Sequence, residues 1–275
     1  MKLKIALIQQ KSSTDISENR RKGLEAVKVA AENGAKIIGF SELAFEPFYP
    51  QTPATEKIRQ MGESIPGPTT ELFSKLAADL GVVIILNLFE RDGDRTYDTS
   101  PVINSDGKLL GTTRMVHITD YPCFHEKGYY HPGDHGAPVY ETAFGKIGVA
   151  ICYDRHYPEY MRALALAGAN IVFVPQAGAV DEWPAGLYEA EMQVAAFQNG
   201  FFTALCNRVG EETMLVFSGE SFVCSPAGEV IARASRGTEE ILYCDLDLGE
   251  TETSHARRLF LRDRRPDVYK EWFSS

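Results

Sequence analysis

Residues 146–159 read KIGVAICYDRHYPE and join an apolar strand to a helix through one cysteine. We predict a strand over 146–151, because this segment is short, rich in β-branched and small residues, and apolar on both faces, as in a sheet buried between layers. Pro158 suits the first turn of a helix over 159–169, because its missing N–H would have no partner there. Cys152 therefore falls at the carboxyl end of a buried strand, where open α/β sheets place their reactive groups.

The alternation of strands and helices continues along the chain and predicts a layered α/β architecture in a single domain, residues 1–275. Strands are expected over 3–9, 37–40, 82–89, 109–118, 171–174, 201–206, 220–224, 230–234 and 240–245, and helices over 16–33, 67–80 and 185–199. Residues 32–38 and 166–172 share the order helix, Gly-Ala, apolar strand. This similarity suggests two related βαβ halves.

Composition and charge exclude several classes of function. The 275 residues are 44% hydrophobic and 24% charged, as in an ordinary globular protein, and the net charge of −10 disfavours nucleic acid as a partner. No apolar run approaches the ~20 residues of a membrane helix, and residues 3–8 are too short for a secretory segment. Five cysteines without CxxC spacing indicate reduced thiols. We expect a cytoplasmic protein that contacts no membrane.

Cys152 is the leading candidate for a nucleophile, and it needs a base because only the thiolate attacks. Glu42 is the best candidate, since it follows the strand predicted over 37–40 and a carboxylate there is costly unless it is used or paired. Two plainer interpretations remain open. Cys152 could be a small buried hydrophobe, and Glu42 could be an exposed cap on the loop that follows it.

Four motifs in register resemble the nitrilase superfamily of carbon–nitrogen hydrolases. They are FSEL at 40–43, RMVHI at 114–118, YYHPGD at 129–134 and ICYDRH at 151–156. The resemblance covers nearly the whole chain and implies a four-layer α-β-β-α sandwich. It also implies a homodimer or higher homo-oligomer, formed through the cysteine-bearing face and a carboxy-terminal tail, residues 248–275.

The resemblance implies roles for individual residues. Carried over, the base is Glu42, the nucleophile is Cys152, and Glu126 is a second glutamate near them. The family's catalytic lysine should lie two residues before His117, where this chain has Met115. The lysines nearest in sequence, Lys108 and Lys127, do not have the register to replace it.

The methionine at position 115 predicts impaired catalysis. An ammonium there would stabilise the oxyanion of the tetrahedral intermediate, and losing one such donor typically costs about 10² to 10³ in rate. Two origins remain open: an introduced Lys→Met change, which the otherwise intact site favours, and a natural deficiency. A third interpretation is a non-catalytic binding protein that keeps the pocket without the chemistry.

The pair Arg155-His156 indicates the substrate. In the family, members that act on N-carbamoyl amino acids are similar in carrying basic residues here, and an arginine can bind a carboxylate bidentately. The resemblance thus implies hydrolysis of an N-carbamoyl β- or α-amino acid to amino acid, CO2 and NH3 through a carbamoyl-cysteine. Alternatives are an aliphatic amide, an N-carbamoylputrescine-type substrate, or an Arg155 paired with Asp154 or Glu159.

Further residues complete the predicted substrate site. The backbone N–H of Tyr153 is expected to donate to the oxyanion, and His117 and Gln176 are expected to contact substrate. A metal site is a weak alternative, because the spacing of Cys123, His125, His131 and His135 matches no zinc pattern. We therefore expect neither a metal nor a cofactor, and a small molecule as the binding partner.

Overall fold

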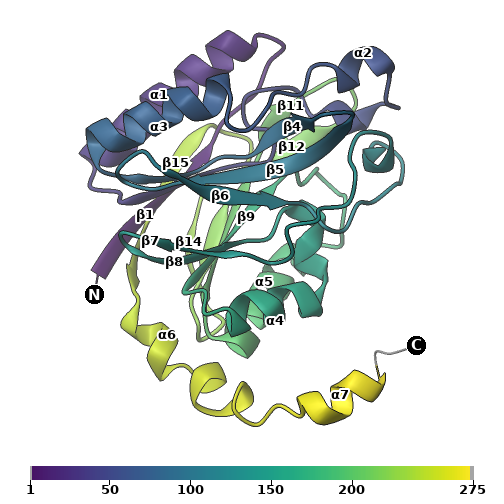
Figure 1. The fold of residues 1–275 in the computed structure, drawn as a ribbon. Helices are drawn as coiled ribbons and strands as arrows, with labels where there is room; N and C mark the ends of the chain where they lie inside the picture. The colour runs from purple at the N-terminus through teal and green to yellow at the C-terminus, as the bar shows by residue number, and fades with distance from the viewer. Residues whose placement is uncertain (1, 273–275) are drawn as a thin grey trace.

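Two β-sheets packed face to face form the centre of the computed structural model, which describes residues 2–272 (Figure 1). The first sheet has the order β15-β1-β2-β3-β5-β4, with β6 paired to β5, and the second has the order β14-β13-β10-β9-β8-β7. The first sheet comprises β1 (Lys2–Gln9), β2 (Ile37–Phe40), β3 (Val83–Ile85), β4 (Leu88–Asp92), β5 (Arg95–Ile103), β6 (Leu109–Arg114) and β15 (Glu240–Asp247). The second comprises β7 (Val139–Thr142), β8 (Gly145–Val149), β9 (Ile171–Gln176), β10 (Phe202–Asn207), β13 (Phe222–Cys224) and β14 (Val230–Arg233).

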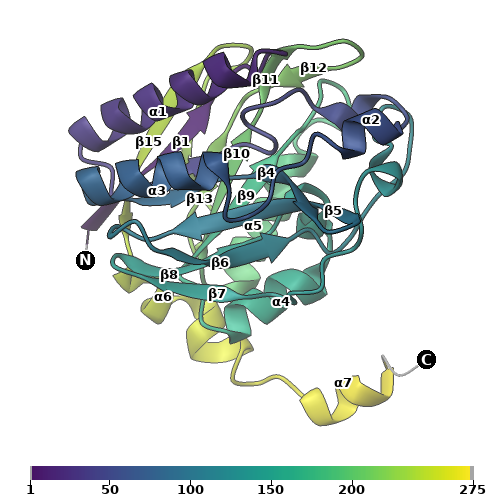
Figure 2. The ribbon, with the colours of Figure 1, turned by 45° about the horizontal axis from the view of Figure 1, so that its top comes forward.

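Helices cover the outer face of each sheet, which completes the four-layer α-β-β-α sandwich (Figures 1 and 2). Helices α1 (Ile16–Glu32) and α3 (Pro68–Leu80) share a buried cluster with the first sheet, and α4 (Pro158–Leu166) and α5 (Leu187–Asn199) share one with the second. Asp15 caps α1 by accepting the N–H of Glu18 at 3.0 Å. The predicted architecture and most predicted elements are confirmed.

The central strands β2 and β9 approach closely where the two sheets meet. A Cβ added to Gly39 on β2 would lie 2.7 Å from the ring of Phe173 on β9, so this crossing requires a glycine. These strands belong to the two segments with similar sequence patterns, one in each sheet. Because β2 and β9 are central and β8 is adjacent to β9, the chain segments that follow β2 and β8 can contribute to one site.

Two predicted strands are shorter or broken in the structure. The strand expected over 82–89 is divided into β3 and β4. The interruption includes Asn87, whose side chain accepts the N–H of Leu43 at 2.7 Å. The strand expected over 109–118 ends at Arg114. Its continuation is lost because the N–H groups of Val116 and His117 donate to a carboxylate, that of Asp154, at 3.2 and 3.0 Å.

Several short elements were not predicted. They are α2 (Glu56–Arg59), β7, the hairpin of β11 (Val209–Glu211) and β12 (Val216–Ser218), α6 (Gly249–Thr253), a π-helical turn (Ala256–Phe260) and α7 (Pro266–Trp272). The last three lie in the predicted tail, where α7 projects away from the two sheets (Figures 1 and 2). Residues 273–275 of that tail lie outside the described residues. Within 2–272, no helix combines the length and apolar character needed to cross a membrane.

Candidate active site

Three side chains from distant parts of the chain meet in the interior. One oxygen of Glu42, one oxygen of Glu126 and the Cys152 sulfur all lie within 4.8 Å of one another. Glu42 and Glu126 are fully buried and Cys152 is 5% exposed. The structure therefore brings together the nucleophile, the base and the second glutamate predicted from sequence.

The backbone at the two strand ends aims these side chains inward. Glu42 follows β2, and its carbonyl accepts from Nη1 of the buried Arg208 at 2.8 Å. Cys152 begins a 3₁₀ turn (Cys152–His156) after β8 and has φ of 42°, in the left-handed region that residues with a side chain rarely adopt. Such strain persists only where the surrounding structure holds it and is frequent at active sites.

The Cys152 thiol is enclosed and weakly acidic in this resting structure. Nε2 of Gln176 donates to its sulfur at 3.2 Å. Burial raises the pKa of Cys152 well above its ordinary value, and the charges of Glu42 and Glu126 raise it further, while Arg155 lowers it. The thiol thus needs a neighbouring base to remove its proton during attack.

Glu42 is suited to accept that proton. Burial, and then the charge of Glu126, raises the pKa of Glu42 to about 8. Burial likewise raises the pKa of Glu126 well above its ordinary value, although the N–H of Thr119 donates to Glu126 at 3.3 Å. Two carboxyl groups with raised pKa values beside a thiol form an arrangement suited to general acid–base catalysis.

Met115 lies in the same buried apolar cluster as Cys152 and is 1% exposed. Its N–H donates to the carbonyl of Asp98 at 2.9 Å, and its carbonyl accepts from Gly133 at 2.8 Å. No lysine is buried anywhere in residues 2–272, and both Lys108 and Lys127 are exposed. Neither of these lysines replaces the one that the resemblance places at 115.

The side chain of Arg155 is buried and hydrogen-bonded to other groups of the protein. Its Nη1 donates to the carbonyl of Cys152 at 3.0 Å and to Oε1 of Gln176 at 2.9 Å, and its Nε lies 3.3 Å from Glu191. Its side chain is 1% exposed, and its guanidinium packs 4.5 Å from the ring centre of Tyr188. The ion-pair partner is therefore Glu191, and neither Asp154 nor Glu159 takes this role. Nη2 of Arg155 has no partner within the described part of the chain.

The other predicted substrate residues surround this centre at different depths. His156 lies 2.6 Å from Glu191 through Nδ1, and the rings of Tyr153 and His156 are 5.0 Å apart. His117 stacks on Tyr157 at 3.5 Å between ring centres. The N–H of Tyr153 belongs to the first turn after Cys152, where such groups lack partners within the turn itself.

Four residues of the site were missed in the sequence. Asp98 and Asp154 are fully buried acids, Glu191 pairs with Arg155, and Glu182 accepts the hydroxyl of Tyr121 at 2.5 Å. Asp98 lies between two Asp-Gly turns, at 92–93 and 106–107, which are typical of antiparallel strands, and Glu191 lies inside the helix expected over 185–199. A charged residue in a buried strand was an available signal for Asp98, since such a group must be paired or neutral. Nothing local marked the others.

Metal-ligating side chains gather at one place only in residues 2–272, and that place is the cluster of Glu42, Glu126 and Cys152. The four candidates of the weaker metal hypothesis, Cys123, His125, His131 and His135, do not form such a group there. His125 instead lies 3.4 Å from Asp120. A thiol flanked by two high-pKa carboxyl groups has the donors of an acyl-transfer site, and we assign it that chemistry.

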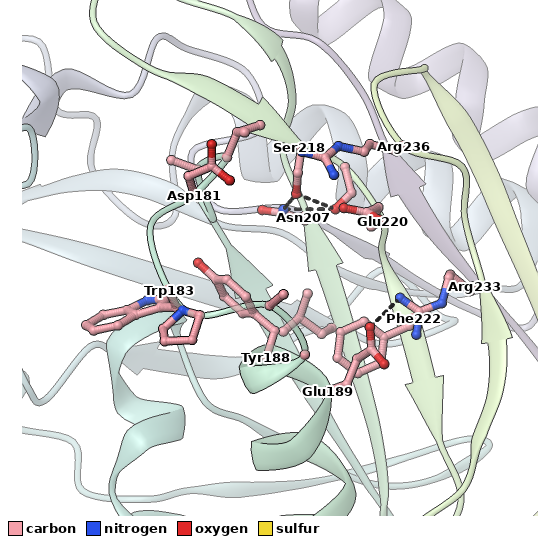
Figure 3. Close-up of a pocket in the computed structure, with 17 residues that line it drawn as sticks. Asp181, Trp183, Tyr188, Glu189, Asn207, Ser218, Glu220, Phe222, Arg233 and Arg236 are labelled. Carbon is pink, nitrogen blue, oxygen red and sulfur yellow. Dashed lines mark hydrogen bonds and ion pairs between the residues drawn. The ribbon is translucent and has the colours of Figure 1, made fainter.

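A separate cavity of about 330 Å³ lies beside the first turn of α5 (Figure 3). Glu189 and Arg233 form an ion pair of 2.8 Å at its edge. Its lining includes none of the three clustered catalytic candidates, and it approaches them through Tyr188, whose ring contacts Arg155. Leu205 and Phe222 in its lining belong to the cluster shared with α4 and α5, so this cavity lies on the helix-covered side of the second sheet.

Several named proteins are similar to this chain in sequence or in structure. The chain is 36% identical to an N-carbamoylputrescine amidase of Solanum lycopersicum, over 97% of this chain and 93% of that protein. It is 32% identical to a citrullinase of Francisella tularensis, over 98% and 97% of the two chains. A carbon–nitrogen hydrolase structure from Helicobacter pylori G27 superposes with a TM-score of 0.92 at 31% identity, covering 99% and 98%.

The family model described as carbon-nitrogen hydrolase matches residues 4–256, which include every member of the catalytic cluster. The match, the relatives and the four-layer fold agree with the resemblance of the motifs. The chain belongs to the carbon–nitrogen hydrolases of the nitrilase superfamily and is a hydrolase of C–N bonds.

Proposed function

We propose that this protein hydrolyses the C–N bond of a small N-carbamoyl compound through a carbamoyl-cysteine on Cys152. The convergence of Glu42, Glu126 and Cys152 within 4.8 Å carries the proposal. A thiol, a base of pKa about 8 and a second buried acid are the groups that a two-step acyl transfer uses.

In the first step, the sulfur of Cys152 bonds to the carbamoyl carbon, and its proton passes to Glu42. The C=O electron pair moves to oxygen, where the N–H of Tyr153 donates to the oxyanion. The C–N bond then breaks, and Glu42 returns the proton to the departing amine. Water next attacks the carbamoyl-cysteine and loses a proton to Glu42. The C–S bond then breaks, Glu42 returns that proton to the sulfur of Cys152, and carbamic acid leaves and decomposes to CO2 and NH3.

Glu182 supports a substrate with a positively charged tail. Its carboxylate accepts the hydroxyls of Tyr121 and Tyr188, each at 2.5 Å. Burial, followed by the charges of Glu182 and Cys152, raises the pKa of Tyr121, so this phenol lies within the field of both groups. Glu182 also acts on Glu126 of the catalytic cluster, and a carboxylate in this region favours an ammonium group. N-carbamoylputrescine has this chemistry, and a relative bears that substrate in its name.

An N-carbamoyl amino acid is the second candidate, and Nη2 of Arg155 favours it. This nitrogen is buried and has no partner in the described range, so a substrate carboxylate that reached it would complete its hydrogen bonding. The other guanidinium nitrogens already contact Gln176 and Glu191, which leaves no bidentate face. The arginine therefore supports a carboxylate less strongly than its position in the sequence suggested.

An assay with two substrates whose tails carry opposite charges distinguishes the two candidates. We expect a higher kcat/KM for N-carbamoylputrescine than for N-carbamoyl-β-alanine, with release of ammonia as the readout and Cys152→Ala as the inactive control. Glu182→Gln should lower kcat/KM for the amine at least about tenfold, because it removes a charge-assisted contact, and leave an uncharged amide of similar length unaffected. An equal loss for both substrates would contradict the ammonium role.

We further propose that Met115 slows this reaction, because none of the lysines in residues 2–272 is buried beside the oxyanion to supply the missing ammonium. Arg155 and Arg208 are the cations that act on Cys152 and Glu42, respectively. Arg155 binds a backbone carbonyl and Gln176, and Arg208 binds the backbone carbonyls of Glu42 and Leu43. These contacts hold both guanidinium groups in fixed positions.

A homodimer is proposed as the working assembly, with the described part of the tail as one contact. Leu259, Phe260 and Trp272 expose 42%, 38% and 64% of their surface there, which is unusual for large apolar side chains in sequence proximity. Light scattering after size exclusion should give twice the chain mass. Replacing these three residues together by serine should give a monomer; an unchanged mass would contradict the role of the tail.

A further inference from the structure

Asp98 is a fourth buried acid in the catalytic cluster. It lies on β5 and has no exposed surface, and Asn87 joins it to the segment of Glu42 by donating to Asp98 and accepting the N–H of Leu43. Its backbone carbonyl accepts the N–H of Met115, so the two residues are cross-strand neighbours. A lysine at position 115 would thus lie beside Asp98, whereas the thioether of Met115 gives it no charge to pair with.

The hydrogen bonds of Asp98 distinguish its two oxygens. Oδ1 accepts from Nδ2 of Asn87 at 2.6 Å. Oδ2 is buried and receives no hydrogen bond from the described residues. An ionised carboxylate would leave Oδ2 charged, desolvated and without a donor, which is unfavourable. A neutral acid with its proton on Oδ2 would instead be a donor.

Glu42 has the complementary deficiency. Both of its oxygens are buried, and no N–H group in residues 2–272 donates to them. The groups that reach this carboxyl are Asp98 and the thiol of Cys152, and each donates only while it holds its proton. Since Cys152 loses its proton during attack, a neutral Asp98 is a donor that can hold Glu42 throughout the reaction.

We propose that Asp98 is a permanently neutral carboxylic acid that donates its Oδ2 proton to Glu42 and thereby positions Glu42 as the general base. Asn87 supports both partners, because its Nδ2 holds Asp98 and its Oδ1 accepts the N–H of Leu43 at 2.7 Å, next to Glu42. Asp98 does not touch the substrate and is a positioning residue. The role of Asp98 in positioning the base rests on the proposed hydrolase function. The neutral state of Asp98 does not depend on that function.

The electrostatics agree with this arrangement. Burial, and then the charge of Glu42 and the hydrogen bond with it, raises the pKa of Asp98 well above its ordinary value, and the same hydrogen bond lowers the pKa of Glu42. Other titratable or charged groups around the pair are Glu126, Cys152, Asp154, Tyr130 and Arg208. Arg208 is the sole cation in that set, so one retained proton reduces the excess of negative charge. A neutral buried aspartic acid is a known hydrogen-bond donor in other active sites.

Infrared spectroscopy tests the protonation without any turnover. At neutral pH, the difference spectrum of unsubstituted protein minus Asp98→Asn should contain the C=O band of a protonated carboxylic acid, which shifts in D2O. The exposed Asp106→Asn is the matched control and should remove a carboxylate band. Loss of a carboxylate band in Asp98→Asn would overturn the proposal. A positive infrared result with no hydrolysis would contradict the proposed function and leave neutral Asp98 standing.

The pH profile tests the positioning role. Asparagine can accept from Asn87 and donate to Glu42 as the neutral acid does, so Asp98→Asn should keep the acidic limb of kcat/KM and stay within about threefold of the unsubstituted rate. Asp98→Ala should lose about tenfold or more and move the limb to higher pH, because Glu42 loses its donor. If Asp98 were ionised, Asp98→Asn would move the limb to lower pH, which would overturn the proposal.

The rate of Cys152 alkylation by iodoacetamide, followed by mass spectrometry of its peptide, gives the same comparison without substrate. The alkylation rate should depend on pH in the same way in the unsubstituted protein and in Asp98→Asn. A shift of this pH dependence to lower pH in Asp98→Asn would overturn the proposal. Circular dichroism would reveal whether Asp98→Ala folds. If it does not, the infrared spectrum and the pH profiles of Asp98→Asn still test the proposal.

Discussion

The carboxylate of Asp154 accepts the backbone N–H of His117 at 3.0 Å and lies 2.7 Å from Nδ1 of the same histidine. Asp154 is two residues beyond Cys152, and His117 is two residues beyond Met115. The contact therefore fixes the turn that bears the nucleophile against the segment that bears position 115. Because Asp154 has no exposed surface, this link is part of the interior of the site.

Replacing Asp154 by alanine should loosen both segments. The N–H groups of Val116 and His117 would lose their acceptor, and each unsatisfied buried group costs about 1 to 3 kcal/mol. We expect urea denaturation to give a free energy of unfolding lower by about 2 kcal/mol or more, together with faster alkylation of Cys152. The exposed Asp106→Ala serves as the control. Equal stability of both variants would contradict the link.

Met115→Lys should raise kcat by about 10² to 10³, because it restores one charged donor beside the oxyanion. The ammonium should also lower the pKa of Glu42 and so move the acidic limb of the profile to lower pH. Met115→Leu, which is neutral and of similar volume, is the control and should behave like the unsubstituted protein. No hydrolysis by Met115→Lys of ureido compounds, amides or nitriles would favour the non-catalytic binding protein.

Glu42 should make the folding stability depend on pH. Its pKa is raised from 4.5 to about 8, so the folded state keeps a proton that the unfolded state releases within this interval. The stabilisation by that proton is complete below pH 4.5 and is lost as pH rises towards 8, by at most about 1.4 kcal/mol per unit. Glu42→Gln lacks this titration.

Urea denaturation between pH 5 and 8 measures this linkage. The free energy of unfolding of Glu42→Gln, relative to the unsubstituted protein, should increase steadily with pH across the interval. A constant difference would mean that Glu42 has an ordinary pKa in the folded state. The exposed Glu56→Gln, which has no buried carboxyl to lose, should give such a constant difference.

Gly133→Ala should destabilise the segment that carries Met115. An added Cβ would lie 2.3 Å from the carbonyl oxygen of Arg114, and the N–H of Gly133 bonds the Met115 carbonyl at 2.8 Å. Overpacking against backbone typically costs about 1 to 3 kcal/mol, and we expect a thermal midpoint lower by several degrees. In the control Gly249→Ala, the nearest atom belongs to the side chain of Asp247 at 3.2 Å. Equal midpoints would contradict the tight approach.

Local sequence patterns predicted most of the framework. The apolar segments before Glu42 and Cys152 are short and bounded by turns, so they identified β2 and β8 and placed both residues beyond strand ends. Prediction failed where a side chain replaced a backbone partner. Asn87 interrupts one expected strand, and Asp154 ends another at Arg114, because each offers a hydrogen bond that competes with the ladder.

The sequence by itself determined the alternation of strands and helices, the position of Glu42 and Cys152 at the ends of two buried strands, and a methionine at position 115. These features depend on periodicity and on neighbours along the chain, which a sequence records directly. Only the tertiary structure decided that Asn87 joins Asp98 to the segment of Glu42, that Arg155 is buried against Gln176 and Glu191, and that Glu182 accepts the hydroxyls of Tyr121 and Tyr188. Protonation and pairing follow from burial and from partners distant in sequence, which no local pattern encodes.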